Sequence, residues 1–302
     1  MTDAETPNET AGIAYAGLAY VLWGFVPVYW RLLDDVPPFA LTTHRVLWCA
    51  VCMAGVAAWR GRLRHVIAIL ATPRLLGTLA LTSLLITINW SLFIYCVATN
   101  QLVEASFGYY LTPLLSMALG VIFFRERMSR VRMVGVAAAA AAVALQAIAV
   151  GHIPLLGLAL AFSFGFYGYF RKKAPVDSSD GLLIETALMF PFALGLVLYW
   201  SQTVPDAFPS GGLLRNTLLV CGGPITAVPL ALFTAGATRI RLTTLGFLQY
   251  LSPSITLVLA TLAYHESFTH ADAASFVLVW AALMIVAFEG WIRSGPAAQE
   301  GG

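Results

Sequence analysis

The sequence predicts an all-α polytopic membrane protein with ten transmembrane helices arranged as two inverted five-helix repeats. Three observations predict this fold: long apolar segments, a one-sided distribution of basic residues, and an internal match at a constant offset. Of the 302 residues, 59% are apolar and 11% are charged, and the mean hydropathy is +0.81. Soluble domains carry about 25% charged residues. A water-soluble fold of this length could not cover its surface with so few charges.

Ten apolar segments are each about long enough to cross a hydrocarbon core of about 30 Å as a helix. They are residues 12–33, 39–59, 75–98, 104–124, 132–150, 153–171, 181–201, 213–237, 243–264 and 271–292. The connections between these segments are short. They leave no room for a separate folded domain, and no basic face with interleaved aromatics suggests nucleic-acid binding.

The basic residues predict the orientation. On one side of the predicted membrane lie 14 of the 17 Lys and Arg residues. The segments that hold them are 60–74, 125–132, 171–180, 238–242 and the C-terminus. Only Arg31 and Arg215 lie on the other side, and Arg45 lies within a helix. Because cytoplasmic loops carry an excess of Lys and Arg, we expect cytoplasmic termini, with a disordered tail at 1–10 and a second tail at 293–302.

The chain matches itself at an offset of 140 residues. The matched pairs include Gly17 with Gly157, Tyr29 with Tyr169, Phe93 with Phe233, Phe107 with Phe247, Tyr110 with Tyr250, Pro113 with Pro253 and Glu126 with Glu266. Hydrophobicity does not explain matched prolines and glutamates. We therefore predict two repeats, 11–150 and 151–292. Since each has five helices, the second enters the membrane from the opposite side, which is a recurring plan of secondary transporters.

Several sequence strings resemble the RarD-type branch of the drug/metabolite transporter superfamily. They are Thr43-His44-Arg45, Asn89-Trp90, the strings 104–113 (EASFGYYLTP), 161–168 (AFSFGFYG) and 171–173 (RKK), Leu183-Ile184-Glu185-Thr186, and 238–250 (TRIRLTTLGFLQY). The resemblance spans about residues 11–292. It implies EamA-like repeats, a bacterial inner-membrane location and permease function. Family members were linked to chloramphenicol sensitivity, and relatives in the superfamily export amino acids and other small metabolites.

Ionisable residues inside a membrane are costly, so those present are candidates for function. The candidate gating or coupling residues are His44, Arg45, Glu104, Glu185, Arg239 and Arg241. Arg45 and Glu185 are equivalent at the 140-residue offset, but inversion separates them by roughly 15 Å along the membrane normal. We therefore expect no pair between them. The expected pairs are Arg45 with Glu104, and Glu185 with Arg239 or Arg241, acting either as alternating gates or as static ties.

Two of these residues are candidates for carrying a coupling proton. His44 titrates near neutral pH in an ordinary environment, although a helix histidine also serves simply as a hydrogen-bond donor. Burial would bring the titration of Glu185 toward the working range. Protons are therefore a candidate coupling ion, although the sequence does not identify the coupling ion.

Aromatic and amide side chains are dense on the helices expected to line a cavity. The candidate substrate-binding residues are Trp23, Tyr29, Asn89, Trp90, Tyr110, Tyr167, Gln249 and Tyr250. They suit a mostly apolar or zwitterionic solute, and aromatic faces also favour a cationic group. Some of these rings could instead face lipid or the membrane interface. Pro27, Pro113 and Pro253 are expected to interrupt their helices.

The leading functional hypothesis is a secondary active transporter that exports small metabolites such as amino acids, or drugs, by alternating access. The absence of a P-loop argues against ATP as the driving force. Alternatives are a non-transporting scaffold or sensor, and an intramembrane enzyme, for which we find no motif. We expect no cofactor and no metal, because Cys49 and Cys52 lack a second Cys/His pair nearby. The expected partners are a small-molecule substrate and the bilayer, with a monomer or a homodimer as the assembly.

Overall fold

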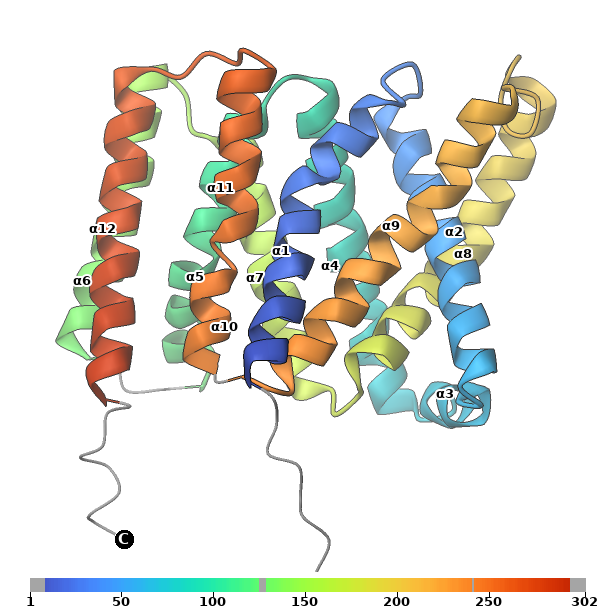
Figure 1. Ribbon diagram of the computed structural model, residues 1–302, viewed down its shortest axis with the longest axis horizontal. Helices are drawn as coiled ribbons and strands as arrows, with labels where there is room; N and C mark the ends of the chain where they lie inside the picture. The colour runs from blue at the N-terminus through green and yellow to red at the C-terminus, as the bar shows by residue number, and fades with distance from the viewer. Residues whose placement is uncertain (1–8, 125–128, 241, 294–302) are drawn as a thin grey trace, which may run out of the picture.

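The computed structural model is all-helical over its described residues, 9–124, 129–240 and 242–293 (Figure 1). The helices are α1 (Glu9–Arg31), α2 (Pro38–Trp59), α3 (Leu63–Leu70), α4 (Pro73–Ala98), α5 (Leu102–Phe124), α6 (Arg130–Val150), α7 (Leu155–Lys173), α8 (Ser178–Thr203), α9 (Leu213–Ala237), α10 (Leu242–Leu248), α11 (Leu251–Val258), the π-helix η1 (Leu259–Ala263) and α12 (His270–Arg293). Each of the ten predicted segments overlaps this helical structure.

Seven helices of the described chain are long and apolar enough to cross a membrane by length and composition. They are α1, α2, α4, α6, α8, α9 and α12. Helix α7 and the segment Leu251–Ala263 are apolar but shorter. The chain is thus a multi-pass membrane protein, and the finer count of ten crossings remains a proposal.

The ends of the predicted tails differ from the structure. Helix α1 already begins at Glu9, so Glu9 and Thr10 are helical, contrary to the predicted tail at 1–10. Helix α12 extends through Arg293. The remainder of both predicted tails lies outside the described residues. Helix α3 is an addition that hydropathy does not predict, and its eight residues are too few to span a bilayer.

The predicted segment 243–264 is not one helix. Helix α10 ends at Leu248, α11 begins at Leu251, and the last turns form η1. Pro253 has no N–H, so the carbonyl of Gln249 loses the partner it would have in a continuous helix. The matched Pro113 lies inside the uninterrupted helix α5, and Pro27 lies inside α1. The expectation that all three prolines interrupt their helices is therefore wrong for Pro27 and Pro113.

The polar side chains of the bundle point inward and large apolar ones point outward. Ile148, Phe192 and Met284 are 82%, 70% and 65% exposed, whereas Asn89 and Glu185 are 2% and 1% exposed. A water-soluble helical protein would show the opposite distribution. The arrangement fits lipid outside, where unpaired polar groups are costly, and hydrogen-bonded polar groups inside.

Helices at equivalent positions of the two sequence halves pack on each other. Helix α2 contacts α8, α5 contacts α11, and α6 contacts α12. The rings of Tyr110 and Tyr250, equivalent at the 140-residue offset, stack with centroids 6.0 Å apart and planes 13° apart. Elsewhere α5 and α7 approach so closely that a Cβ at Gly108 would collide with the carbonyl of Gly157. The interface between the halves therefore runs through the whole bundle.

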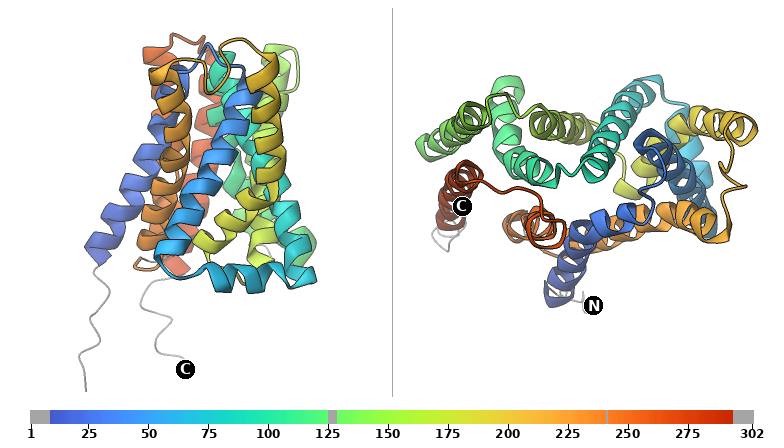
Figure 2. Two further views of the ribbon diagram at one scale, coloured as in Figure 1. Left: turned by 90° about the vertical axis from the view of Figure 1, so that its right-hand side faces the viewer. Right: turned by 90° about the horizontal axis from the view of Figure 1, so that it is seen from above.

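The long helices run side by side, and Figures 1 and 2 show them in two rows. Helices α12, α11, α1 and α9 form the row nearer the viewer in Figure 1, with α6, α5, α7 and α4 behind them. The first helical residue, Glu9, and the end of α12 lie at the same end of the bundle as α3. We call this the terminal end, and the other the opposite end.

Candidate functional site

A buried cation lies on α2. Arg45 is 7% exposed, and its Nε donates a hydrogen bond of 3.1 Å to Oγ1 of Thr226 on α9. The guanidinium carbon lies 4.1 Å from the centre of the Trp90 ring on α4 and 5.4 Å from that of Trp30 on α1. Three helices and α2 itself therefore surround this charge with aromatic rings and a hydroxyl.

A fully bonded amide lies next to Trp90 in α4. The Nδ2 group of Asn89 donates to the carbonyl of Leu160 (3.1 Å) and to Oγ of Ser163 (3.0 Å), both on α7. Its Oδ1 accepts a hydrogen bond of 3.0 Å from the hydroxyl of Tyr109 on α5. Asn89 thus ties α4, α5 and α7 together beside the Arg45 cluster.

A buried acid lies on α8, which packs against α2. Oε1 of Glu185 is 3.4 Å from Nε of Arg171 on α7 and accepts a hydrogen bond of 2.7 Å from the hydroxyl of Thr82 on α4. Oε2 accepts a hydrogen bond of 3.2 Å from the hydroxyl of Tyr167. The hydroxyl of Ser83 bonds the backbone carbonyl of Glu185. The carboxylate is therefore neutralised and hydrogen-bonded inside the protein.

The predicted ion pairs are wrong for the described residues. Arg45 contacts Thr226 and the indole rings, while Glu104 accepts a hydrogen bond of 3.0 Å from the backbone N–H of Gly157. Arg239, in the turn after α9, donates to the carbonyl of Ala235 at the end of α9, 2.6 Å away, and Glu185 pairs with Arg171 instead. Arg241 lies outside the described residues. Arg45 and Glu185 do not pair with each other in the described structure, in agreement with the expectation from their depths.

The reason for the corrected partner is the register of α7. Arg171 and Tyr167 are one helical turn apart on α7, so both reach the same face. Their chain neighbours Lys172 and Lys173 made Arg171 look like a member of a cytoplasmic basic cluster. The side chain of Arg171 is only 13% exposed, because it points into the protein toward Glu185. A depth estimate for each basic residue, instead of a loop assignment, would have identified it.

His44 lies away from the Arg45 cluster despite being its chain neighbour. Its ring is 5.5 Å from that of Phe208 in the connection between α8 and α9. Nδ1 is buried and has no hydrogen-bond partner among the described residues. The structure thus gives this nitrogen no donor or acceptor role.

The predicted substrate-binding residues do not gather in one place. Asn89 and Trp90 lie at the Arg45 cluster, Tyr29 packs on Trp30 of that cluster with ring centroids 4.9 Å apart, and Tyr167 lies at Glu185. Trp23 packs against Phe233 of α9, with ring centroids 5.7 Å apart. Tyr29 also bonds the carbonyl of Leu218. The remaining three lie elsewhere: Tyr110 stacks on Tyr250 and bonds Ser254, and Gln249 lies in the turn between α10 and α11.

Ion pairs also lie at both ends of the bundle. At the terminal end Arg62 binds Asp180 through two nitrogens, one hydrogen bond measuring 3.1 Å. The hydrogen bond and the negative charge of Asp180 raise the pKa of the Arg62 guanidinium. At the opposite end Arg215 lies 3.2 Å from Asp35. There, too, Arg31 lies 4.0 Å from Glu266. The sequence reasoning did not identify any of these pairs.

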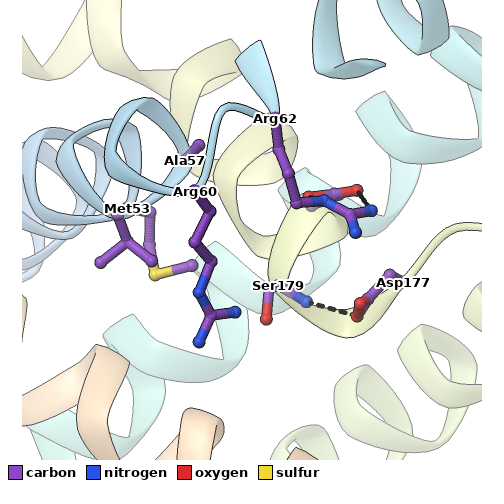
Figure 3. Close-up of a pocket in the computed structure, with 8 residues that line it drawn as sticks. Met53, Ala57, Arg60, Arg62, Asp177 and Ser179 are labelled. Atoms are coloured by element: carbon purple, nitrogen blue, oxygen red, sulfur yellow. Dashed lines mark hydrogen bonds and ion pairs between the residues drawn. The ribbon is translucent and has the colours of Figure 1, made fainter. Parts of the chain in front are cut away.

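A small pocket adjoins the Arg62–Asp180 pair (Figure 3). Its lining residues are Met53, Val56, Ala57, Arg60, Arg62, Asp177, Ser179 and Asp180. Its volume is about 30 Å³, whereas a site for a small molecule measures about 300–1,000 Å³. The pocket therefore admits water and not a metabolite.

Comparison with known proteins agrees with this architecture. The sequence model of the EamA-like transporter family matches twice, at residues 10–148 and 153–288. An "Uncharacterized transporter" of Vibrio cholerae is 40% identical over 97% of this chain and 98% of its own. "Protein RarD" of Escherichia coli strain K12 is 36% identical over 91% of this chain and 93% of its own.

One solved structure, titled only "Crystal structure of protein", shares the fold. It is 17% identical, with a TM-score of 0.57, and the match covers 92% of this chain and 98% of that one. The doubled family match and the relatives, which are transporters and not enzymes, both cover nearly the whole chain. The chain therefore belongs to the EamA-like transporter family, and it is a membrane transporter with relatives named RarD.

Proposed function

We propose that the chain is a secondary active transporter that exports small metabolites such as amino acids, or drugs, by alternating access. The observation that carries this proposal is the packing of α2 on α8, because these equivalent helices hold the buried charges Arg45 and Glu185. A membrane scaffold has no need to bury charges at such an interface, since each is costly in lipid.

The proposed architecture is ten crossings in two inverted repeats, 11–150 and 151–292. The contacts α2–α8, α5–α11 and α6–α12, together with the Tyr110–Tyr250 stack, support it. Equivalent elements contact each other where a two-fold axis passes between them. An inverted pair of repeats can exchange conformations, so that the site opens to one side and then to the other.

The ion pairs at the two ends are the proposed gates. Opening the terminal end requires Arg62–Asp180 to separate, and opening the opposite end requires Asp35–Arg215 and Arg31–Glu266 to separate. The structure has pairs at both ends, which fits an occluded form. We place the terminal end in the cytoplasm of a bacterial inner membrane, on the basis of the basic residues.

The solute site is proposed to lie at Arg45, Asn89 and Trp90, and the remaining predicted aromatics to shape the path. Glu185 is the better candidate for a coupling proton, because its carboxylate has bonds from three residues on two other helices that protonation would weaken. Nδ1 of His44 has no hydrogen-bond partner among the described residues, and its ring lies 5.5 Å from that of Phe208. No cofactor is proposed, and a monomer contains the whole path.

The test is solute flux in proteoliposomes, with labelled amino acids and cationic drugs and with or without a pH gradient. Saturable flux of at least one solute is the expected result, and dependence on the gradient would show proton coupling. Glu185→Gln should keep solute exchange but lose the response to the gradient. An absence of flux for every solute, with folded and inserted protein, would favour the scaffold or sensor and contradict the proposal.

A further inference from the structure

Arg45 differs from most buried carboxylates of the described residues in having no counter-charge; the exception is Asp272, which is bonded by Gln146 and Thr269 instead of a cation. Four acids with side chains less than 10% exposed each have an arginine within 4.0 Å: Asp180, Glu185, Glu266 and Glu289 pair with Arg62, Arg171, Arg31 and Arg132. Arg45 is as buried as these acids, yet no carboxylate of the described residues lies within that distance.

The surroundings of Arg45 leave part of its hydrogen-bonding capacity unused. Nε is the nitrogen that bonds Thr226, and the hydroxyl of Thr226 in turn donates to the carbonyl of Gly222. No described residue accepts a hydrogen bond from Nη1 or Nη2. An unneutralised guanidinium inside a membrane protein costs several kcal/mol. A functional demand must offset that cost.

We infer that Arg45 binds the carboxylate of the transported solute, an inference that rests on the proposed transport function. The guanidinium edge presents two parallel N–H groups that match the two oxygens of a carboxylate. Trp90 and Trp30, which already contact the guanidinium, offer apolar walls beside it. The substrate class is therefore an organic monocarboxylate with an apolar or aromatic body, amino acids included.

A carboxylate bound to Arg45 would also change the energetic cost of moving α2 within the bundle. The empty site holds one positive charge, and a bound monocarboxylate without an ammonium group neutralises it; an amino acid neutralises it only locally, at the carboxylate. Because a neutral cluster moves through a low-dielectric interior at less cost than a charged one, the bound carboxylate favours the movement of α2 against α8 and α9. Glu185 cannot supply this charge, since Arg171 already neutralises it.

The experiment compares matched carboxylate and amide ligands on the purified full-length protein in detergent. The probes are L-phenylalanine with its amide, 3-phenylpropionate with its amide, and indole-3-acetate with its amide, plus benzenesulfonate and phenyl phosphate as other anions. Ligand binding is measured by the rise of the unfolding temperature. We expect at least one carboxylate to bind at least about tenfold more tightly than its amide, as lost charge-assisted hydrogen bonds predict.

Two variants at the site and one control sharpen the result. Arg45→Gln should abolish the carboxylate preference, and Arg45→Lys, which keeps the charge without the planar fork, should weaken it about tenfold. Arg132→Gln removes an arginine that already has an acid, Glu289, 3.6 Å away, and should leave the preference unchanged. Monodisperse elution shows that each variant is folded.

Several outcomes would overturn the inference: equal binding of carboxylate and amide, a preference kept in Arg45→Gln, tighter binding of the sulfonate or phosphate, or no carboxylate bound at all. Flux separates this failure from that of the proposed function. If a solute without a carboxylate is transported equally by wild type and Arg45→Gln, transport stands and the carboxylate assignment falls. If nothing is transported, the proposed function itself is contradicted.

Discussion

Arg45 and Glu185 occupy equivalent positions of two matching sequence halves, yet their side chains have different partners. Glu185 has an arginine and two hydroxyls on its carboxylate. Arg45 has one hydroxyl and two indole rings, and no acid of the described residues pairs with it. If both side chains served only to hold helices together, each buried charge would be expected to have a partner of opposite charge. The difference indicates that Glu185 contributes to holding helices together, whereas Arg45 is kept available for a ligand.

The largest effect is expected from removing the counter-ion of Glu185. Arg171→Gln leaves a buried carboxylate without its cation, so the free energy of unfolding should fall by about 3–5 kcal/mol. Denaturation in detergent, followed by circular dichroism, measures the change. The double variant Arg171→Gln with Glu185→Gln should recover most of the loss, because it leaves no buried charge. A double variant as unstable as the single one would show that Arg171 acts through packing.

A smaller effect is expected from the hydroxyl that bonds the same carboxylate. Thr82→Val keeps the shape of the side chain and removes the 2.7 Å hydrogen bond to Oε1 of Glu185. The loss should be about 1–2 kcal/mol, at the upper end of hydrogen bonds between membrane helices. Thr78→Val on the same helix is the control, since its hydroxyl bonds only the carbonyl of Arg74. Equal losses in both variants would speak against a role of Glu185.

The third effect concerns Tyr167, whose hydroxyl makes the longer of the two hydroxyl hydrogen bonds to the Glu185 carboxylate. Tyr167→Phe removes a hydrogen bond of 3.2 Å, and the expected loss is about 0.6 kcal/mol. Thermal unfolding with and without the Thr82→Val background measures it. Because both hydroxyls bond one carboxylate, the two losses should not add. Strict additivity would argue that the two hydroxyls act independently.

The smallest effect on stability is expected at the terminal end. Asp180→Asn breaks the pair with Arg62. Asp180 is buried, but the substitution leaves no buried charge behind, and Arg62, with a side chain that is 43% exposed, stays in contact with water, so the loss should be about 0–1 kcal/mol. Its effect should appear in access instead. A cysteine introduced at Ser179, in the pocket lining, should react faster with a membrane-impermeant maleimide in Asp180→Asn than with Asp180 intact. An unchanged rate would remove this pair from the proposed gate.

The sequence alone was sufficient to predict the helical segments and the division of the chain into two similar halves. Hydropathy located the helical segments, and the 140-residue offset identified the halves that the family model also matches. Apolar periodicity could not distinguish Pro253, where the helix breaks, from Pro113, where it continues, because the surrounding packing decides whether a lost hydrogen bond is replaced.

Partner assignments failed because they depend on helix rotation, which hydropathy does not encode. Glu104 was assigned to Arg45 by depth alone, but it turns toward the backbone of Gly157 on α7. Arg171 was counted among the loop cations because two lysines follow it. Thr82 and Thr226 escaped notice since a hydroxyl inside an apolar segment usually bonds its own helix, and only the fold shows which hydroxyl meets a charge.

The central claim is that Glu185 has a counter-charge inside the protein and Arg45 does not. The most direct test compares the unfolding temperature of Arg45→Gln with that of Arg171→Gln, without ligand. Replacing Arg45 removes an uncompensated buried cation and leaves no acid behind, so we predict an unfolding temperature equal to or above that of the wild type. Arg171→Gln should unfold well below it. Equal destabilisation by the two substitutions would contradict the account, because it would mean that Arg45 already has its counter-charge inside the protein.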